Sequence, residues 1–441
     1  MTSAPELKIH RSLVRGLKLF DADRLRWLDE ATALGPLVAL KMGPVKLWVV
    51  TDLEAARTIL LTDSSSWTRP PALVTPIRVG VGENLFTQSE KAWTRLQPSV
   101  APAFRKRALE RRLADVDALV ADEVQTLPHD TTIDLELAMG RIALTLAAWV
   151  LLGERLEPTR AEEIVYHQRQ VVRWVGVQLG KVSGISPIVV GSKAREMRRH
   201  RAVLNNYADE VIARAKSAGT TRDDVLGALL DARPSMKALT PTRLRSHVLG
   251  LFLAGNETTA AALSWALVHG SLSPEQWTLV RDDPDRYTLP FLTETLRCTP
   301  AVWGVPRTPT KGGVTLTSRG HVARIRRGQV ATVYLRGLNR DPNTWDDPLR
   351  FRPSRHDASA KQDQRALLPF GLGPRGCIGQ HLAMGELTAV LPALARHGNI
   401  TVDGSTTEDA GFALRVAGGL TGRFAPVTPA NPDPQLSPTV A

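Results

Sequence analysis

The order of apolar and polar positions predicts many helices and a smaller number of strands. Residues 37–50 (LVALKMGPVKLWVV) contain two β-branched, partly alternating runs on either side of a Gly-Pro turn, which is typical of a hairpin. From about residue 90 to 285, apolar residues recur mainly at helical spacing. Strand-like runs return near 313–335 and 411–426. The pattern therefore predicts a mainly α protein with a smaller β part, without the alternation of a βαβ fold.

No change of composition and no Gly/Ser linker divides the 441 residues, so we expect one domain over residues 1–426. Residues 427–441 (VTPANPDPQLSPTVA) are rich in proline and short of apolar clusters, which predicts a disordered tail. The most apolar stretch, LTLAAWVLLG from Leu144, is shorter than a bilayer span and suits a core helix. Because the N-terminus also lacks an apolar run of signal-peptide length, we expect a cytoplasmic protein without a membrane span.

The composition narrows the chemistry that the chain can perform. Its two cysteines, Cys298 and Cys377, exclude a disulfide framework and a four-cysteine zinc site, and they favour a reducing compartment. The net charge is +12, but lysine and arginine are spread along the chain and no nucleic-acid-binding motif is present. We therefore expect an acidic protein partner or an acidic substrate rather than nucleic acid.

Residues 367–383 (LLPFGLGPRGCIGQHLA) contain two motifs at once. Three glycines fit G-x-G-x-x-G, but a dinucleotide fold needs a buried strand before them. The preceding residues are polar and end at Pro369, and Pro374 removes an amide N–H that a phosphate would use. The glycine pattern is therefore weak evidence for phosphate binding.

Cys377 follows these glycines and precedes a run with apolar residues at helical spacing. Its thiol is thus expected in a loop at a helix start, where free amide groups and the helix dipole favour a thiolate. The surrounding glycines would let a flat ligand approach the backbone closely. A single thiolate without a second protein ligand suits a metal whose other positions are filled. Haem iron, with four porphyrin nitrogens and one axial protein ligand, is such a metal.

Residues 250–267 predict a long apolar helix that is interrupted at its centre by Gly-Asn-Glu-Thr-Thr, residues 255–259. A glycine in a helix interior costs about 1 kcal/mol relative to alanine, and a glutamate among apolar neighbours risks desolvation. Several unfavourable residues together in one helix, here a glycine and a glutamate, are expected at a functional site. The alternative is a solvent-facing polar stripe, which five consecutive residues cannot form on one helical face.

Glu294 and Arg297 lie at i and i+3, on one face of a predicted helix. Most such pairs are exposed and structural, but apolar neighbours indicate a partly buried pair here. Residues 339–356 (NRDPNTWDDPLRFRPSRH) predict a long irregular loop, which is usually functional or tightly packed.

Together these residues resemble the cytochrome P450 family of haem-thiolate monooxygenases. The segment Phe370-Gly371-x-Gly373-x-Arg375-x-Cys377-x-Gly379 matches the family's cysteine-ligand loop. Glu294-x-x-Arg297 and Phe351-x-Pro353-x-Arg355 match its structural charge network, and Ala254-Gly255-x-Glu257-Thr258-Thr259 matches its oxygen-binding groove. The motifs occur in the family's order and spacing, and the resemblance covers roughly residues 35–426. It implies a single P450-like fold that encloses haem b, of the soluble bacterial type.

The resemblance also implies roles for single residues. Cys377 is the expected axial iron ligand, and the expected partners of the haem propionates are Arg375, Arg307 and Trp93. One position departs from the family, which usually has an arginine four residues after that tryptophan, where this chain has Gln97. The other residues expected to contact the cofactor are Phe370, Gly371, Ala254 and Gly255.

Glu257 and Thr258 match the family's acid–alcohol pair, which delivers the protons that oxygen activation requires. The resemblance places the substrate among residues that include Leu253, Val302, Trp303, Trp174 and Leu420. An aromatic or bulky apolar substrate would stack well against the two tryptophans. The alternative for each tryptophan is an ordinary position in the aromatic core.

We therefore predict a monooxygenase that inserts one oxygen atom from O2 into an organic substrate, free or bound to a carrier, in secondary metabolism. Electrons would come from an acidic ferredoxin or flavodoxin with its reductase, and the basic run 91–112 is the expected docking face. A second basic run, 193–201, is expected on the substrate side. The alternatives are an atypical oxidation on the same haem, such as coupling, desaturation or nitration, and a non-catalytic haem-binding protein.

Overall fold

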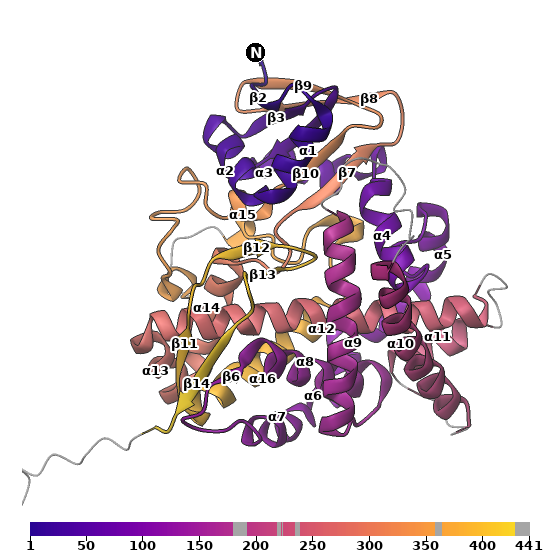
Figure 1. Cartoon of the computed structure of the whole chain (residues 1–441), viewed down its shortest axis with the longest axis vertical. Helices are drawn as coiled ribbons and strands as arrows, with labels where there is room; N and C mark the ends of the chain where they lie inside the picture. The colour runs from indigo at the N-terminus through magenta and orange to yellow at the C-terminus, as the bar shows by residue number, and fades with distance from the viewer. Residues whose placement is uncertain (180–191, 218–221, 223, 234–238, 358–363, 428–441) are drawn as a thin grey trace, which may run out of the picture.

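The computed structural model describes residues 1–179, 192–217, 222, 224–233, 239–357 and 364–427. A mostly β region, built from the N-terminal segment and from residues 305–333, lies at one end of the molecule, and helices form the rest (Figure 1). The strands of this region are β1 (Thr2–Ser3), β2 (Glu6–His10), β3 (Leu37–Met42), β4 (Val45–Val50), β5 (Trp67–Thr68), β7 (Val305–Pro309), β8 (Gly313–Ser318), β9 (His321–Arg326) and β10 (Val330–Val333).

The largest sheet has the strand order β2-β3-β4-β10-β7-β5. The predicted hairpin over residues 37–50 is confirmed, because β3 and β4 pair antiparallel from Leu37–Val50 to Met42–Val45. Strands predicted between residues 313 and 335 are also present, as β8, β9 and β10. The N-terminal strands β1 and β2 were not predicted. They are short, and they take their strand partners β9 and β3 from later in the chain.

Helices α1 (Leu13–Ala22), α2 (Arg24–Leu34) and α3 (Leu53–Arg57) lie with the strands of the β region (Figure 1). The other helices are α4 (Pro71–Val81), α5 (Glu90–Val100), α6 (Lys106–Leu113), α7 (Val116–Gln125), α8 (Leu135–Leu152), α9 (Pro158–Leu179), α10 (Ser192–Ser217), α11 (Val225–Ala232), α12 (Pro241–Leu272), α13 (Pro274–Asp282), α14 (Pro284–Cys298), α15 (Leu335–Leu338) and α16 (Gln380–His397). The remaining strands of the described chain are β6 (Ile133–Asp134), β11 (Asn399–Asp403), β12 (Glu408–Ala410), β13 (Leu414–Val416) and β14 (Thr421–Ala425). The predicted mainly α class is confirmed, and α12 crosses the helical region from side to side (Figure 1).

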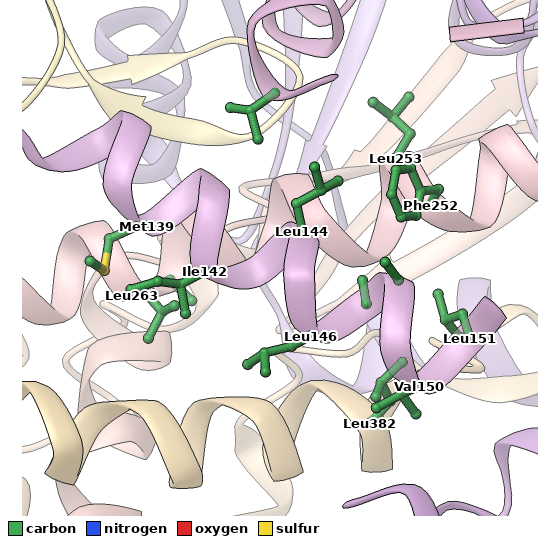
Figure 2. Packing of buried hydrophobic residues seen from close by; sticks show 14 of the residues in the cluster. Met139, Ile142, Leu144, Leu146, Val150, Leu151, Phe252, Leu253, Leu263 and Leu382 are labelled. Atoms are coloured by element: carbon green, nitrogen blue, oxygen red, sulfur yellow. The ribbon is translucent and has the colours of Figure 1, made fainter. Parts of the chain in front are cut away.

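The core lies where α8 packs against α12 and α16 (Figure 2). Leu144 and Leu146 of α8, Leu263 of α12 and Leu382 of α16 are all buried in one hydrophobic cluster. Each such side chain contributes about 1.5–3 kcal/mol when it is removed from water. This packing fixes the two helices that carry the interrupted segment 255–259 and the residues that follow Cys377.

Among the described residues, α8 is the one helix that is long and apolar enough to cross a membrane, and 83% of it is buried inside the fold. It is therefore a core helix, as the apolar stretch from Leu144 predicted. The structure shows it to begin earlier, at Leu135, with Asp134 accepting a hydrogen bond from the Leu137 amide as its N-cap. The predicted tail, 427–441, lies outside the described residues apart from Val427.

Candidate active site

The cysteine loop is shaped by backbone positions that exclude side chains. Gly373 has φ +74°, and a Cβ atom there would lie 1.9 Å from the carbonyl oxygen of Leu60. The Cys377 amide donates to the Phe370 carbonyl at 2.8 Å, which closes the loop on itself. Helix α16 starts three residues after Cys377, at Gln380. The loop therefore presents the thiol just before a helix N-terminus, as the sequence predicts.

The two thiols lie in different environments. Cys377 is exposed, whereas Cys298 is buried beside Arg297 in α14. Burial raises the pKa of the Cys298 thiol to about 12, so that this group stays protonated at neutral pH. Partial burial also raises the pKa of the Cys377 thiol, contrary to the predicted preference for a thiolate, and the hydrogen bond from the Gly379 amide lowers this pKa only in part. Of the two, Cys377 is the thiol that an incoming metal centre can reach.

Helix α12 stays continuous through the interruption that the sequence marks at its centre. Ala254 is exposed and Thr258 half-buried, although most of their neighbours on α12 are buried. The Thr258 hydroxyl donates to the Ala254 carbonyl at 2.7 Å, a back-bond within the helix. Ala254 and Thr258, four residues apart, thus form an accessible stripe on one face of an otherwise covered helix.

Glu257 does not pair with Thr258 in this structure. Its carboxylate accepts hydrogen bonds from Arg415 of β13, from Nε at 2.8 Å and also from Nη2. Arg415 Nη1 lies 2.9 Å from Glu136 of α8, which in turn pairs with Arg169 of α9 at 2.8 Å. Glu257 is 4% exposed, so its charge is balanced inside the protein rather than by water. The sequence could not show this partner, which lies 158 residues away.

A small cavity adjoins the ion pairs that Arg415 makes with Glu257 and Glu136. It has a volume of about 20 Å³, and its lining includes Glu257, Arg415, Gln168, Asn256 and Ser264. The Ser264 hydroxyl is buried without a hydrogen-bond partner. A polar cavity of this size holds about one water molecule, and such a water would join the Ser264 hydroxyl to the groups around Glu257.

The next threonine on α12 points to a different group. Thr259 donates to the Glu386 carboxylate of α16 at 3.2 Å, and both residues are buried. Burial raises the pKa of Glu386 to about 8, so this carboxyl is mostly protonated at neutral pH. Thr258 and Thr259 therefore have separate surroundings, although they are adjacent in sequence.

Cationic side chains gather beside the cysteine loop. The Arg375 guanidinium lies 4.0 Å from the Trp93 ring centroid, and its Nε donates to Glu90 at 3.2 Å. Its Nη2 is 2.8 Å from the same carboxylate but is not aligned for a hydrogen bond, and it is buried. Arg307 of β7 is 9% exposed. Burial first, and repulsion by Arg375 second, lower the pKa of Arg307 to about 10.

Sequence reasoning missed Arg69, which belongs to the same cationic group. Burial and then repulsion by Arg375 lower its pKa to about 9. Arg69 follows β5 directly, and this two-residue strand carries no motif of its own. Its placement depends on the pairing of β5 with β7, which the local sequence does not reveal.

The structure brings Glu294, Arg297 and Arg355 together in one buried network. Arg297 donates to the two oxygens of Glu294 at 2.7 and 2.9 Å, and Arg355 Nε donates at 2.9 Å. His356 and the backbone amide of Arg352, both missed from the sequence, each contact Glu294 at 2.8 Å. These donors hold the pKa of the Glu294 carboxyl well below its usual range, against the effect of burial.

The same network fastens the long loop 339–356. Arg297 donates through Nη1 to the carbonyls of Asn339 and Pro348, each at 2.8 Å, and through Nη2 to that of Arg350 at 3.2 Å. Because Arg297 and Glu294 are both 0% exposed, water cannot replace these contacts. The loop is therefore irregular but tightly held.

The candidate substrate residues do not share one environment. Val302 is 36% exposed, while Leu253 and Leu420 are buried. Trp174 is half-buried against the main hydrophobic cluster. Trp303 packs against the cluster of the N-terminal sheet, and its indole donates to the Gly411 carbonyl at 3.1 Å. Trp303 is thus half-buried at the N-terminal sheet, and its role in binding a substrate stays a prediction.

A basic surface lies on the side of the cysteine loop. Helix α6 contacts α16, the helix that follows Cys377. Arg105, Lys106 and Arg107 at the start of α6 are exposed, as is Arg111 further along it.

The chain matches the family model of cytochrome P450 over residues 23–410. It is 25% identical over 395 residues to the cyclooctat-9-en-7-ol 5-monooxygenase of Streptomyces melanosporofaciens, covering 84% of either chain. The fold is similar to that of CYP175A1 from Thermus thermophilus, with a TM-score of 0.77 and 22% identity over 96% of this chain and 100% of the other. It is also similar to the retinoic-acid-bound cyanobacterial CYP120A1, with a TM-score of 0.80 and 19% identity over 97% and 100% of the two chains.

Proposed function

Because the chain belongs to the cytochrome P450 family and is a haem monooxygenase, we propose that it inserts an oxygen atom from O2 into an apolar or aromatic small molecule. The observation that carries this proposal is the loop that presents Cys377 exposed, just before α16, while the other cysteine is buried. Haem b is the cofactor of the family, and its iron bound to a thiolate activates O2.

The residues present fit this cofactor. Cys377 would supply the thiolate that binds the iron, with Phe370 and Gly371 beside it in the loop. Ala254, on the accessible stripe that it forms with Thr258, offers a small side chain on which a flat macrocycle could rest. The neighbouring Gly255 instead faces Leu151 and Ala147 of α8. Arg307, Arg375 and Trp93 would hold the propionates. The buried Arg375 Nη2 without a hydrogen bond is the group that such a carboxylate would satisfy.

Proton delivery would use Thr258 and Glu257 in separate roles. The Thr258 hydroxyl now donates to the Ala254 carbonyl, so its oxygen lone pairs remain able to accept a hydrogen bond from water. Glu257 is held by Arg415, away from that hydroxyl. It can relay a proton only through the adjoining water-sized cavity or after its carboxylate leaves Arg415. Arg415 is thus a positioning residue for Glu257.

For the electron donor, we propose an acidic ferredoxin or flavodoxin that docks on the basic surface of α6. Opposite charges speed encounter, and salt screens them with a Debye length of about 10 Å at 0.1 M. Reversing the charge of Arg105 or Arg107 should slow reduction by an acidic ferredoxin, and added salt should do the same. Arg199, exposed on α10, is the matched control. Reduction that is insensitive to salt, or more sensitive at Arg199, would place docking elsewhere.

The experiment that tests the function has two steps. The reduced, CO-bound protein should show the red-shifted Soret band of a thiolate ligand, which Cys377→Ala should abolish and Cys298→Ala should keep. A substrate found by its shift of the haem spectrum should then be turned over under labelled O2, with one labelled oxygen atom in the product. A product oxidised without that label would instead indicate coupling or desaturation.

A further inference from the structure

We propose that Arg69 is a third guanidinium that binds the propionates of haem b, and that it supplies the charge missing at Gln97. The inference rests on the haem binding by Cys377 proposed above. It concerns a residue outside every motif that the chain shares with the family.

The strand pairing places Arg69 beside Arg307. Strands β5 and β7 pair antiparallel, with Trp67 opposite Pro309 and Thr68 opposite Thr308. One residue further in this register, Arg69 comes opposite Arg307, which is paired on its other side with Ala331 of β10. The two guanidinium groups therefore start from adjacent backbone positions at the edge of the largest sheet.

Contacts of the side chain direct Arg69 toward α5. Its Nη2 donates to the Gln88 carbonyl at 2.6 Å, and its Cζ lies 5.3 Å from the Phe86 ring centroid. Both residues belong to the segment that leads into α5, which carries Glu90 and Trp93. Since Arg375 lies over Trp93 and pairs with Glu90, the guanidinium groups of three separate segments gather around one helix start.

The charges of this group match those of two propionates. Within the part of the chain that the structure describes, neither Arg69 nor Arg307 has a carboxylate within 4.0 Å, and Glu90 pairs with Arg375 alone. Three guanidinium groups and one carboxylate leave a net charge of +2, and haem b carries two ionised propionates. The lowered pKa values of Arg69 and Arg307 are consistent with this, because they reflect cations that are half-buried and buried, respectively, and that lack a neighbouring anion.

The position of Gln97 explains why such a cation is required. Gln97 stands one turn after Trp93 on α5 and is neutral, where the family usually has an arginine. An arginine at position 69, in the β5–α4 connection, instead of at position 97 on α5 keeps the number of cations available to the propionates unchanged. The competing explanation is that Arg69 only ties its loop through the Gln88 carbonyl.

Arg78 provides a matched control for that explanation. It donates to the neighbouring carbonyl, that of Thr87, at 2.8 Å, but it is exposed on α4. Replacement of either arginine by glutamine removes one guanidinium–carbonyl hydrogen bond from the same loop. Only the replacement of Arg69 removes a half-buried cation from the group around Arg375.

The test measures haem loss from the ferric holoprotein to excess apomyoglobin, together with the reduction potential of the iron. Arg69→Gln should speed haem loss by about ten- to a hundredfold, the effect of one charge-assisted hydrogen bond. It should also lower the reduction potential, since less positive charge near the propionates favours the ferric state. Arg69→Lys should retain the potential, and adding Gln97→Arg to Arg69→Gln should restore both quantities.

A purely structural role predicts another result. Arg69→Gln and Arg78→Gln would then speed haem loss equally and leave the potential unchanged, and Gln97→Arg would not rescue. That outcome would overturn the assignment of Arg69. It would leave the thiolate band of Cys377 intact, so it is distinguishable from a failure of the proposed function.

Discussion

The buried ion pair between Arg297 and Glu294 leads to a specific prediction about the stability of the protein. We expect Arg297→Ala to destabilise the protein by about 3–5 kcal/mol, because it removes one buried cation from Glu294 and leaves buried carbonyls of the loop 339–356 without a donor, at about 1–3 kcal/mol for each such group. The structure supports the upper part of this range. Besides Glu294, the side chain serves the carbonyls of Asn339, Pro348 and Arg350, and it is 0% exposed.

The size of this loss is large for a folded protein. Native proteins are stable by only about 5–15 kcal/mol, so the substitution removes about a fifth or more of that margin. Glu294 would keep Arg355, His356 and the Arg352 amide, so the carboxylate itself would not be left alone. The loss should therefore arise mainly from the freed carbonyls of the loop 339–356, and loosening of this loop should lower the haem content.

The assay is denaturant unfolding of the ferric holoprotein, followed by the Soret band and by tryptophan fluorescence, with haem counted per chain. Arg352→Ala is the matched control, because it lies in the same loop but pairs with Asp346 at side-chain exposures of 36% and 81%. Such a pair contributes at most about 1 kcal/mol, and the backbone amide of Arg352 still reaches Glu294. If Arg297→Ala and Arg352→Ala unfold at the same denaturant concentration with full haem, the reasoning fails.

Three further predictions concern the helix α12 and its surroundings. Thr258→Ala should divert electrons from product to hydrogen peroxide while haem binding stays intact, and Thr259→Ala, whose hydroxyl faces Glu386 instead, should keep the coupling of electrons to product. Arg415→Leu should destabilise the protein by about 3–5 kcal/mol, because it leaves Glu257 buried without its cation, and an unfolding curve like that of the unaltered protein would contradict this. Burial lowers the pKa of His269 to about 3, below its ordinary 6.5, so the unfolded chain binds the proton first as pH falls. The contribution of the neutral His269 to the free energy of unfolding should therefore be fully present above pH 6.5 and should decline below it by about 1.4 kcal/mol per pH unit. In unfolding measured from pH 7.5 to 5, His269→Gln should reduce this slope.

The sequence alone determined the elements whose signals are local. The hairpin over residues 37–50, the buried apolar helix around Leu144 and the interrupted helix over 250–267 follow from the spacing of apolar positions. The cysteine loop is local as well, since glycines and a following helical run describe it within about a turn or two of Cys377. These features are readable because each depends on residues a few positions apart.

Tertiary structure decided which charged groups meet. Glu257 and Thr258 are adjacent in the sequence, yet successive side chains on a helix point about 100° apart, so Glu257 turns to Arg415 and Thr258 does not. The packing of Trp303 against the N-terminal sheet was likewise not visible in the sequence, and its role in binding a substrate stays a prediction. Arg69 carried no motif, and only the register of β5 on β7 sets it opposite Arg307. Partners more than a hundred residues apart are chosen by packing and strand register, and no local pattern records that choice.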